Sequence, residues 1–235
     1  MIAIIDERMP LAYQADLEKR GFDIISLPPF PRLPAPVASH PDMLIFLSHG
    51  KLITHKEYYS IAKDKLDAIA EHTQSELILS SENISDKYPH DILFNAAKVG
   101  SHVFGRTNYI SRHISDICAQ NRLNLVDVKQ GYSKCSTCVV DINAIITYDD
   151  SILNAAQKQD IQVLKISPGH IRLDGYDTGF IGGASGLCGD TVYFCGNIDF
   201  HPDAQKIRGF CAERGKNVIS LSEHELIDVG TIFFA

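Results

Sequence analysis

One arrangement of apolar and polar residues recurs along this chain and restricts its fold more than any other feature. It consists of a short apolar hairpin, an amphipathic helix and a further apolar strand, and residues 136–167, "STCVVDINAIITYDDSILNAAQKQDIQVLKIS", are the clearest copy. The β-branched runs at 139–140 and 144–147 predict two strands around a turn. Asp149 or Asp150 then offers an N-cap for a helix, and residues 163–166 predict the closing strand. Units of this kind predict a mixed α/β protein.

The units repeat at nearly constant spacing. The residues that open their hairpins are Asp42, Asp91, Cys135, Asp177 and Asp228. Their separations are 49, 44, 42 and 51 residues, a period typical of repeat architectures. The first strand, "IAIID", lacks a hairpin partner, and the last segment, "DVGTIFFA", is a lone strand, so pairing them completes a fifth unit. We therefore predict a single domain over residues 1–235, a five-bladed pseudo-symmetric α/β-propeller of ββαβ units with the N- and C-terminal strands paired in one blade. The alternative is a generic α/β sheet with evenly spaced elements.

Composition excludes several classes of protein. No run of about 18 apolar residues is present, so a membrane span is not expected. The start "MIAIIDERMP" has no basic segment before its apolar residues, which argues against a signal peptide. Six cysteines without an export signal predict free thiols in a reducing, cytoplasmic compartment. The formal charge of −7 argues against nucleic acid as a partner. We expect no cofactor, and a homo-oligomer is compatible with the sequence.

Several short segments resemble one known superfamily. Asp91-Ile-Leu-Phe, followed by Gly105-Arg-Thr-Asn108, is similar to its glycine-aspartate strand and its "RTN" turn. "HPDMLIF" at 40–46 looks like its first Pro-Asp strand, and "GYSKCSTC" at 131–138 looks like its His-Leu-Lys segment. With the five-unit order, these segments resemble the pentein, or α/β-propeller, superfamily of guanidino-group-modifying enzymes, most closely an uncharacterised bacterial branch. The resemblance implies a pentein fold and, for an active member, hydrolysis of C–N bonds in guanidino compounds.

The resemblance also shows where this chain departs from the hydrolases. They use a cysteine just before the last strand, where this chain has Gly230-Thr231. They use a histidine in the segment that aligns with Tyr132. Both expected catalytic positions are changed, and fold alone does not define a function.

Repeat symmetry would bring the residues at equivalent positions to one centre. Four carboxylates, those of Asp42, Asp91, Asp177 and Asp228, would then face a common space. Carboxylates pair with the forked donors of a guanidinium, so we expect a site for a small guanidino or amino cation. The alternative is that each aspartate merely caps the entry to a strand.

Two further residues are candidate ligand contacts. Arg106 lies where a hairpin leads into a helix, for which Thr107 or Asn108 is the expected N-cap. A structural Arg106, paired to a carboxylate of the next unit, is the other interpretation. Ser185 is part of the run 182–186, "GGASG", which lacks the lysine of a phosphate loop and instead indicates close approach of backbones.

Cys135 is the only predicted central residue that is able to act as a nucleophile. Its base would be His90, beside Asp91, or His40, beside Asp42. The alternative is a small buried cysteine, the commoner role of a free thiol. A metal or redox role for Cys135 and Cys138 is disfavoured, because residues three apart in a strand point to opposite faces.

Two functional hypotheses follow. In the first, the acidic centre binds a small guanidino or amino compound without the Cys-His hydrolase machinery. In the second, the protein is a deiminase-like hydrolase with Cys135 as its nucleophile. The proline-rich segment 28–41 is either a lid over the centre or a surface strap.

Overall fold

The computed structural model describes all residues from Met1 to Ala235. Its strands form five three-stranded sheets and one two-stranded sheet. In each three-stranded sheet the middle strand pairs antiparallel with one neighbour and parallel with the other. The mixed α/β class is therefore confirmed.

Each three-stranded sheet carries one helix, which connects its two parallel strands. The first sheet consists of β17 (Phe233–Phe234), β1 (Ile2–Asp6) and β2 (Asp23–Leu27), with helix α1 (Leu11–Lys19). The second consists of β3 (Ile45–Ser48), β4 (Lys51–His55) and β5 (Glu76–Ser80), with α3 (Lys56–Thr73), and the third of β6 (Ala97–Val99), β7 (His102–Gly105) and β8 (Asn124–Asp127), with α4 (Arg112–Gln120). The fourth consists of β9 (Cys138–Asp141), β10 (Ala144–Thr147) and β11 (Gln162–Lys165), with α5 (Asp150–Gln157), and the fifth of β13 (Ser185–Cys188), β14 (Thr191–Phe194) and β15 (Asn217–Ser220), with α6 (Ala204–Ala212). The remaining elements are α2 (Pro41–Leu44), the 3₁₀ turns η1 (Ala35–Val37) and η2 (Ile198–Phe200), and the sheet β12 (Ile171–Arg172) with β16 (Leu226–Ile227).

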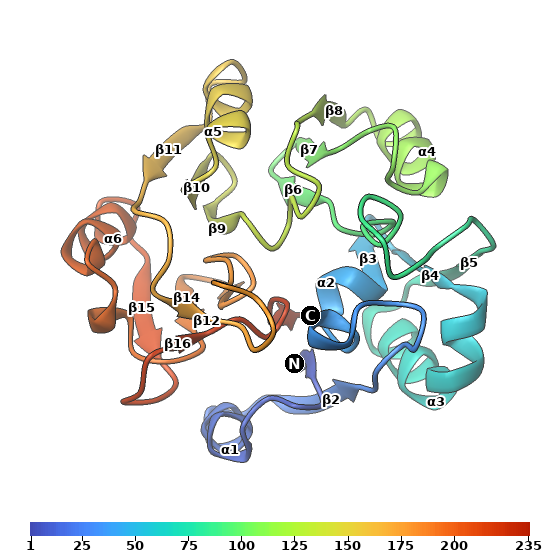
Figure 1. Ribbon diagram of the computed structural model, residues 1–235, viewed down its shortest axis with the longest axis horizontal. Coiled ribbons are helices and arrows are strands. Elements are labelled where there is room, and N and C mark those ends of the chain that lie inside the picture. Colours follow the sequence, from blue (N-terminus) through green and yellow to red (C-terminus); the bar gives the residue numbers. More distant parts are fainter.

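The two ends of the chain meet in one sheet. β1 pairs antiparallel with β17, with Ala3 opposite Phe234 and Ile4 opposite Phe233, as the sequence predicts. Figure 1 shows both termini near the middle of the view, with the sheets arranged around that middle and α1, α3, α4, α5 and α6 on the outside. The five sheets stay separate, and no continuous sheet closes on itself.

Middle strands such as β1, β4, β10 and β14 are almost wholly buried, because they are covered on both faces. The third strand of each sheet alternates or stays half-buried, as expected at an outer edge. None of the helices combines the length and the apolar character that a membrane crossing requires.

Local signals located most element ends correctly. Asp149 caps α5, accepting hydrogen bonds from the backbone N–H of Ser151 and Ile152 at 2.8 and 2.9 Å. For α4 the prediction was wrong: Ser111, not Thr107 or Asn108, is the N-cap. Thr107 instead donates its hydroxyl to Asp127 at 2.7 Å, which holds residues 106–110 in a turn ahead of the helix.

The residues predicted to open the hairpins lie in turns before the first strand rather than in the strand. Asp42 is in the short helix α2, and Asp91 precedes β6 by six residues. Asp177 lies in a loop, eight residues before β13. The connection that carries Asp177 also contributes β12, which pairs with β16 of the following unit.

Candidate functional site: a buried acidic centre

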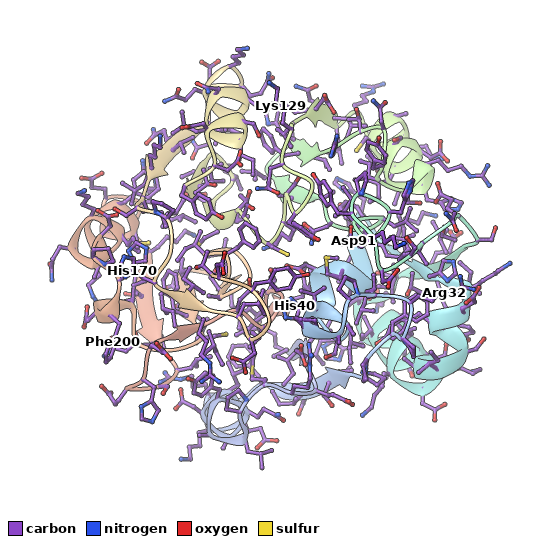
Figure 2. All side chains as sticks on the ribbon, viewed as in Figure 1. Arg32, His40, Asp91, Lys129, His170 and Phe200 are labelled. Carbon is purple, nitrogen blue, oxygen red and sulfur yellow. The ribbon has the colours of Figure 1, made fainter.

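Three of the predicted aspartates are buried, together with the predicted cysteine. Asp42, Asp91, Asp228 and Cys135 each have 6% or less of their surface exposed. Figure 2 labels Asp91 and His40 toward the middle of the molecule, inside the outer helices. We call Asp42, Asp91, Asp228, His40, Lys134 and Cys135 the acidic centre.

Asn95 holds the thiol of Cys135 in place. Its side-chain N–H group lies 3.0 Å from the Cys135 sulfur and also reaches the backbone carbonyl of Asp42 at 3.1 Å. Its carbonyl oxygen accepts from the backbone N–H of Lys134 at 2.7 Å. Asn95 is fully buried, so this one amide joins the turn before β6 to the turn before β9.

The electrostatic surroundings of Cys135 keep it a thiol. Burial raises its pKa well above the ordinary value, and the neighbouring carboxylates of Asp42 and Asp228 raise it further. The bond from Asn95 acts in the opposite direction but is the smallest of these effects. A nucleophile needs thiolate, so the apo centre does not activate this cysteine.

Thr231 connects Asp42 to Lys134. Its hydroxyl donates to Asp42 Oδ2 at 2.9 Å and accepts from Lys134 Nζ at 3.1 Å. The backbone of Thr231 has φ +71°, in the left-handed region that β-branched residues rarely adopt. Gly230 and Thr231 lie in the region where the resemblance places the nucleophilic cysteine of the hydrolases.

Tyr132 stands where the resemblance places the histidine base. Its hydroxyl donates to Asp91 Oδ2 at 2.5 Å. Burial raises the pKa of Asp91, and the bond from Tyr132 opposes that rise. Burial, with this bond to Asp91, also raises the pKa of Tyr132, so the phenol stays protonated at neutral pH.

His40 lies between two carboxylates. Its Nε2 is 3.8 Å from Asp6 Oδ2 and its Nδ1 is 3.7 Å from Asp228 Oδ1. Burial lowers the pKa of His40 more than Asp228 and Asp6 raise it, so the ring is neutral near pH 7. Asp6 already has a full cationic partner, because Arg8 binds it through Nε at 3.0 Å and Nη2 at 2.7 Å.

Glycines let the backbone pack against Asp228. A Cβ on Gly183 would lie 2.0 Å from Asp228 Oδ1, and one on Gly179 would lie 2.5 Å from Asp228 Cβ. Asp228 accepts from the backbone N–H groups of Phe180 and Gly230, both at 2.9 Å. The expected role of the run 182–186 in close backbone approach is therefore confirmed.

Several polar atoms of the acidic centre have no hydrogen-bond partner. They are Asp42 Oδ1, Asp91 Oδ1 and His40 Nδ1. Buried polar atoms normally have partners, so these three are positions where a bound molecule or water would be stabilised. No set of three or more His, Cys, Asp or Glu side chains is arranged to hold a metal ion.

A large cavity of about 910 Å³ reaches the acidic centre from one side. Asp6, His40 and Asp228 line its inner part, and Arg172, Glu225 and Phe200 are among its other lining residues. The proline-rich segment borders it through Pro36, and Arg8 fastens that segment by donating to the carbonyls of Ala35 and Pro36 at 2.8 and 2.9 Å.

Two predicted site residues lie outside the acidic centre. Asp177 is exposed, in the loop between β12 and β13, and its carboxylate makes no hydrogen bond or ion pair. His90 is exposed and packs edge-on against Tyr109 at 5.9 Å, with no hydrogen bond to Cys135. The prediction of His90 as a base for Cys135 therefore has no geometric support.

The other two predicted contacts have local partners. Arg106 donates to the Tyr88 hydroxyl at 2.8 Å and stacks over Tyr109 at 4.7 Å, so aromatic rings replace the expected carboxylate partner. Ser185 is buried at the start of β13, where its hydroxyl donates to the Gly182 carbonyl at 3.2 Å.

Sequence reasoning missed two residues that support the acidic centre, Asn95 and Arg8. Asn95 had a signal, since it is a polar residue inside the apolar run "DILFNAA". Arg8 binds Asp6, two residues away, but its bonds to Ala35 and Pro36 had no signal, because those residues lie 27 and 28 positions away along the chain.

Comparisons with known proteins agree with the fold. Residues 4–233 match a family described as "Family of unknown function (DUF6873)". No curated protein matches the chain in sequence. Among solved structures, dimethylarginine dimethylaminohydrolase (DDAH) from Pseudomonas aeruginosa, a Cys-to-Ser variant complexed with citrulline, has a TM-score of 0.60 at 15% identity, over 90% of this chain and 79% of that one.

Two other enzymes give similar scores. The N-terminal domain of ArgZ, an arginine dihydrolase from cyanobacteria, has a TM-score of 0.56 at 9% identity, over 91% of this chain and 79% of that one. SxtG, an amidinotransferase from Microseira wollei, has 0.54 at 11% identity, over 92% and 79%. All three are members of the pentein superfamily, so the chain has the pentein fold.

Proposed function

This chain belongs to the Family of unknown function (DUF6873), and we propose that its acidic centre binds a small guanidino or amino cation without the Cys-His chemistry of pentein hydrolases. The observation that carries the proposal is the pair of buried carboxylate oxygens, Asp42 Oδ1 and Asp91 Oδ1, that have no partner. A cation with several N–H donors would satisfy both, and charge-assisted bonds of this kind are strong.

We also propose that the five three-stranded sheets are the blades of one pseudo-fivefold α/β-propeller forming a single domain. Support comes from a cavity of about 340 Å³ whose lining includes one or more residues from the first strand of every sheet. These are Phe46 of β3, Lys98 of β6, Val139 of β9, Leu187 of β13 and Phe233 of β17. Five first strands that share one cavity are expected when the sheets surround a common axis.

The absence of hydrolysis is argued from three side chains. The Cys135 thiol is buried between carboxylates that raise its pKa, so thiolate is scarce. The resemblance aligns Gly230-Thr231 and Tyr132 with the regions of the pentein hydrolases that carry the catalytic cysteine and histidine. The hydroxyls of Thr231 and Tyr132 both donate to aspartates of the centre. A threonine hydroxyl that donates to a carboxylate, with no imidazole bonded to it, is not an activated nucleophile.

The known pentein enzymes suggest the ligand class to test first. The structures with this fold include complexes of DDAH with citrulline and of ArgZ with its substrate. The ligand of this chain would enter through the large cavity, whose inner residues Asp6, His40 and Asp228 adjoin the centre.

Isothermal titration calorimetry with arginine, agmatine and methylated arginines tests the proposal, together with a colorimetric assay for ureido products. We expect one of these cations to bind and no ureido product to form. Asp42→Asn removes a charge with almost no change of shape, so it should weaken binding about tenfold or more. Asp177→Asn is the matched control and should leave binding unchanged, because Asp177 is exposed.

Two results would overturn the proposal. Turnover that disappears in Cys135→Ser would establish the hydrolase hypothesis instead. Equal loss of binding in Asp42→Asn and Asp177→Asn would mean that the cation is attracted by the acidic surface of the protein and not by the centre.

A further inference from the structure

A second cavity has the opposite charge to the acidic centre. We call the 340 Å³ cavity the lysine cavity, because Lys98 and Lys134 line it. Its remaining lining residues are Phe46, Leu47, Ala96, Val139, Ser185, Gly186, Leu187, Thr231, Ile232, Phe233 and Phe234. No carboxylate is among them, although the protein has 29 acidic and 22 basic residues.

Neither lysine has an anionic partner at hydrogen-bond distance. Lys98, in the middle of β6, is half-buried and makes no ion pair or side-chain hydrogen bond. Lys134 Nζ bonds only to neutral oxygens, Thr231 Oγ1 at 3.1 Å and the Thr137 carbonyl at 3.5 Å. Both lysines therefore line a small space that contains no carboxylate, although the Asp42 carboxylate is linked to Lys134 through Thr231.

Apart from Ser185, Gly186 and Thr231, the rest of the lining is apolar and differs in exposure. Leu47, Val139, Leu187, Phe233 and Phe234 are half-buried, whereas Phe46, Ala96 and Ile232 are buried. The cavity thus has an apolar floor and a rim that reaches solvent. A pocket of a few hundred Å³ with apolar walls and a few placed polar groups is the usual form of a small-molecule site.

We propose that the lysine cavity binds a small monoanion with an apolar tail, such as a medium-chain carboxylate. The carboxylate would pair with Lys98 and Lys134, and the tail would lie against the rings and branched side chains of the first strands. This site shares Lys134 with the acidic centre but none of its carboxylates, and it does not depend on the function proposed for that centre.

Lys134 and Thr231 also place the two sites in contact. Thr231 Oγ1 bonds both Lys134 Nζ, which lines the lysine cavity, and Asp42 Oδ2, which belongs to the acidic centre. We therefore test the lysine cavity with Lys98, which makes no hydrogen bond to the acidic centre.

Calorimetric titration with octanoate tests the inference directly. Octanol has the same chain without the charge, and acetate has the charge without the chain, so both should bind about tenfold or more weakly than octanoate. Lys98→Met should weaken octanoate about tenfold and leave octanol unchanged. Octyl phosphate distinguishes a carboxylate site from a phosphate site. If it binds more tightly than octanoate, the proposal of a carboxylate ligand is wrong and the anionic group that the cavity binds is a phosphate.

The matched control is Lys129→Met, since Lys129 is exposed, unpaired and, in Figure 2, at the outside of the molecule. It should bind octanoate like the wild type. Equal affinity for octanol and octanoate, or equal loss in Lys98→Met and Lys129→Met, would overturn the inference.

Methyl NMR of the wild-type protein locates the site without any substitution. Octanoate should shift the methyl signals of Val139, Leu187 and Ile232 before those of other residues. Shifts confined to another region, or none at saturating octanoate, would refute the site even if Lys98→Met does not fold.

Discussion

The hydroxyl of Thr231 is the most exacting test of how the acidic centre is held together. It is buried, donates to Asp42 Oδ2 at 2.9 Å and accepts from Lys134 Nζ at 3.1 Å. Thr231→Val keeps the shape and removes these two bonds, together with the contact between the hydroxyl and the Gly182 carbonyl at 3.0 Å. Asp42 Oδ1 already lacks a hydrogen-bond partner. In the variant, Asp42 Oδ2 would also lose its bond from the threonine hydroxyl.

The expected cost follows from the loss of a bond to a buried charged group, about 2–3 kcal/mol of the free energy of unfolding. For a chain of this size, that lowers the melting temperature by about 5–10 °C. Urea unfolding followed by circular dichroism measures this loss of stability. The slope of the free energy of unfolding against urea concentration should equal that of the wild type, because only then does a shifted midpoint report on stability.

Thr231→Ser is the matched control. It keeps the hydroxyl, loses one buried methyl worth about 0.8 kcal/mol, and relaxes the β-branched side chain at φ +71°. The lost methyl destabilises the variant and the relaxed backbone stabilises it, so we expect its free energy of unfolding to lie within about 1 kcal/mol of the wild type. If the Val and Ser variants unfold at the same urea concentration, the hydroxyl does not support the centre and the reasoning is wrong.

Three other predictions follow from the same region and from the cysteines. Gly183→Ala should destabilise the protein by about 3 kcal/mol or more, because its Cβ would lie 2.0 Å from Asp228 Oδ1. Gly209→Ala in helix α6 should stabilise the protein by about 0.5–1 kcal/mol, because the space around that position is open. Thermal melts of the two variants measure both changes. Burial raises the pKa of Asp228 above its ordinary value of 3.8. Above pH 3.8 the native protein therefore holds a proton on Asp228 more often than the unfolded chain does. As the pH rises through the raised pKa, that proton is lost and the contribution of Asp228 to the free energy of unfolding falls. The stability lost in Asp228→Asn should therefore be largest near pH 4 and smaller at pH 8, and urea titrations that give the reverse trend would contradict the assigned direction. In the native protein a thiol reagent should react first at Cys188, which is the only cysteine that is not buried. Cys135 should react only when the protein unfolds. Peptide mapping identifies the modified residue.

The repeated units were predictable because each carries its own local signals. Asp149 before α5 and the Gly189-Asp190 turn between β13 and β14 specify their elements from adjacent residues. The pairing of β1 with β17 was predictable for a different reason: each would otherwise lack an antiparallel partner.

The failures have a common physical origin. Asp177 was assigned by spacing alone, and the structure places it in an exposed loop eight residues before β13. The pairing of Ile171 with Leu226 joins segments 55 residues apart, and neither segment shows a hairpin signal. Contacts of that range depend on how whole units pack, and a local pattern does not encode them.

The chemistry of the centre was only partly predictable. Residue types identified Asp42, Asp91, Asp228 and Cys135, and burial confirms that they are inside the protein. Sequence reasoning proposed His40 as a base beside Asp42, but it did not reveal that Lys134 shares that interior, although both residues are decisive for its charge. Burial lowers the pKa of Lys134, with Asp42 opposing that change, and this coupling exists only after folding.

The most direct test of the central claim uses arginine and agmatine labelled with ¹³C at the guanidino carbon. The carbon signal is followed by NMR with wild-type protein over several hours. Our account predicts a signal that shifts or broadens with protein concentration, is restored by Asp42→Asn, and never converts to a ureido carbon. A growing ureido signal that Cys135→Ser abolishes, or a guanidino signal that the wild-type protein leaves unaltered, would contradict it.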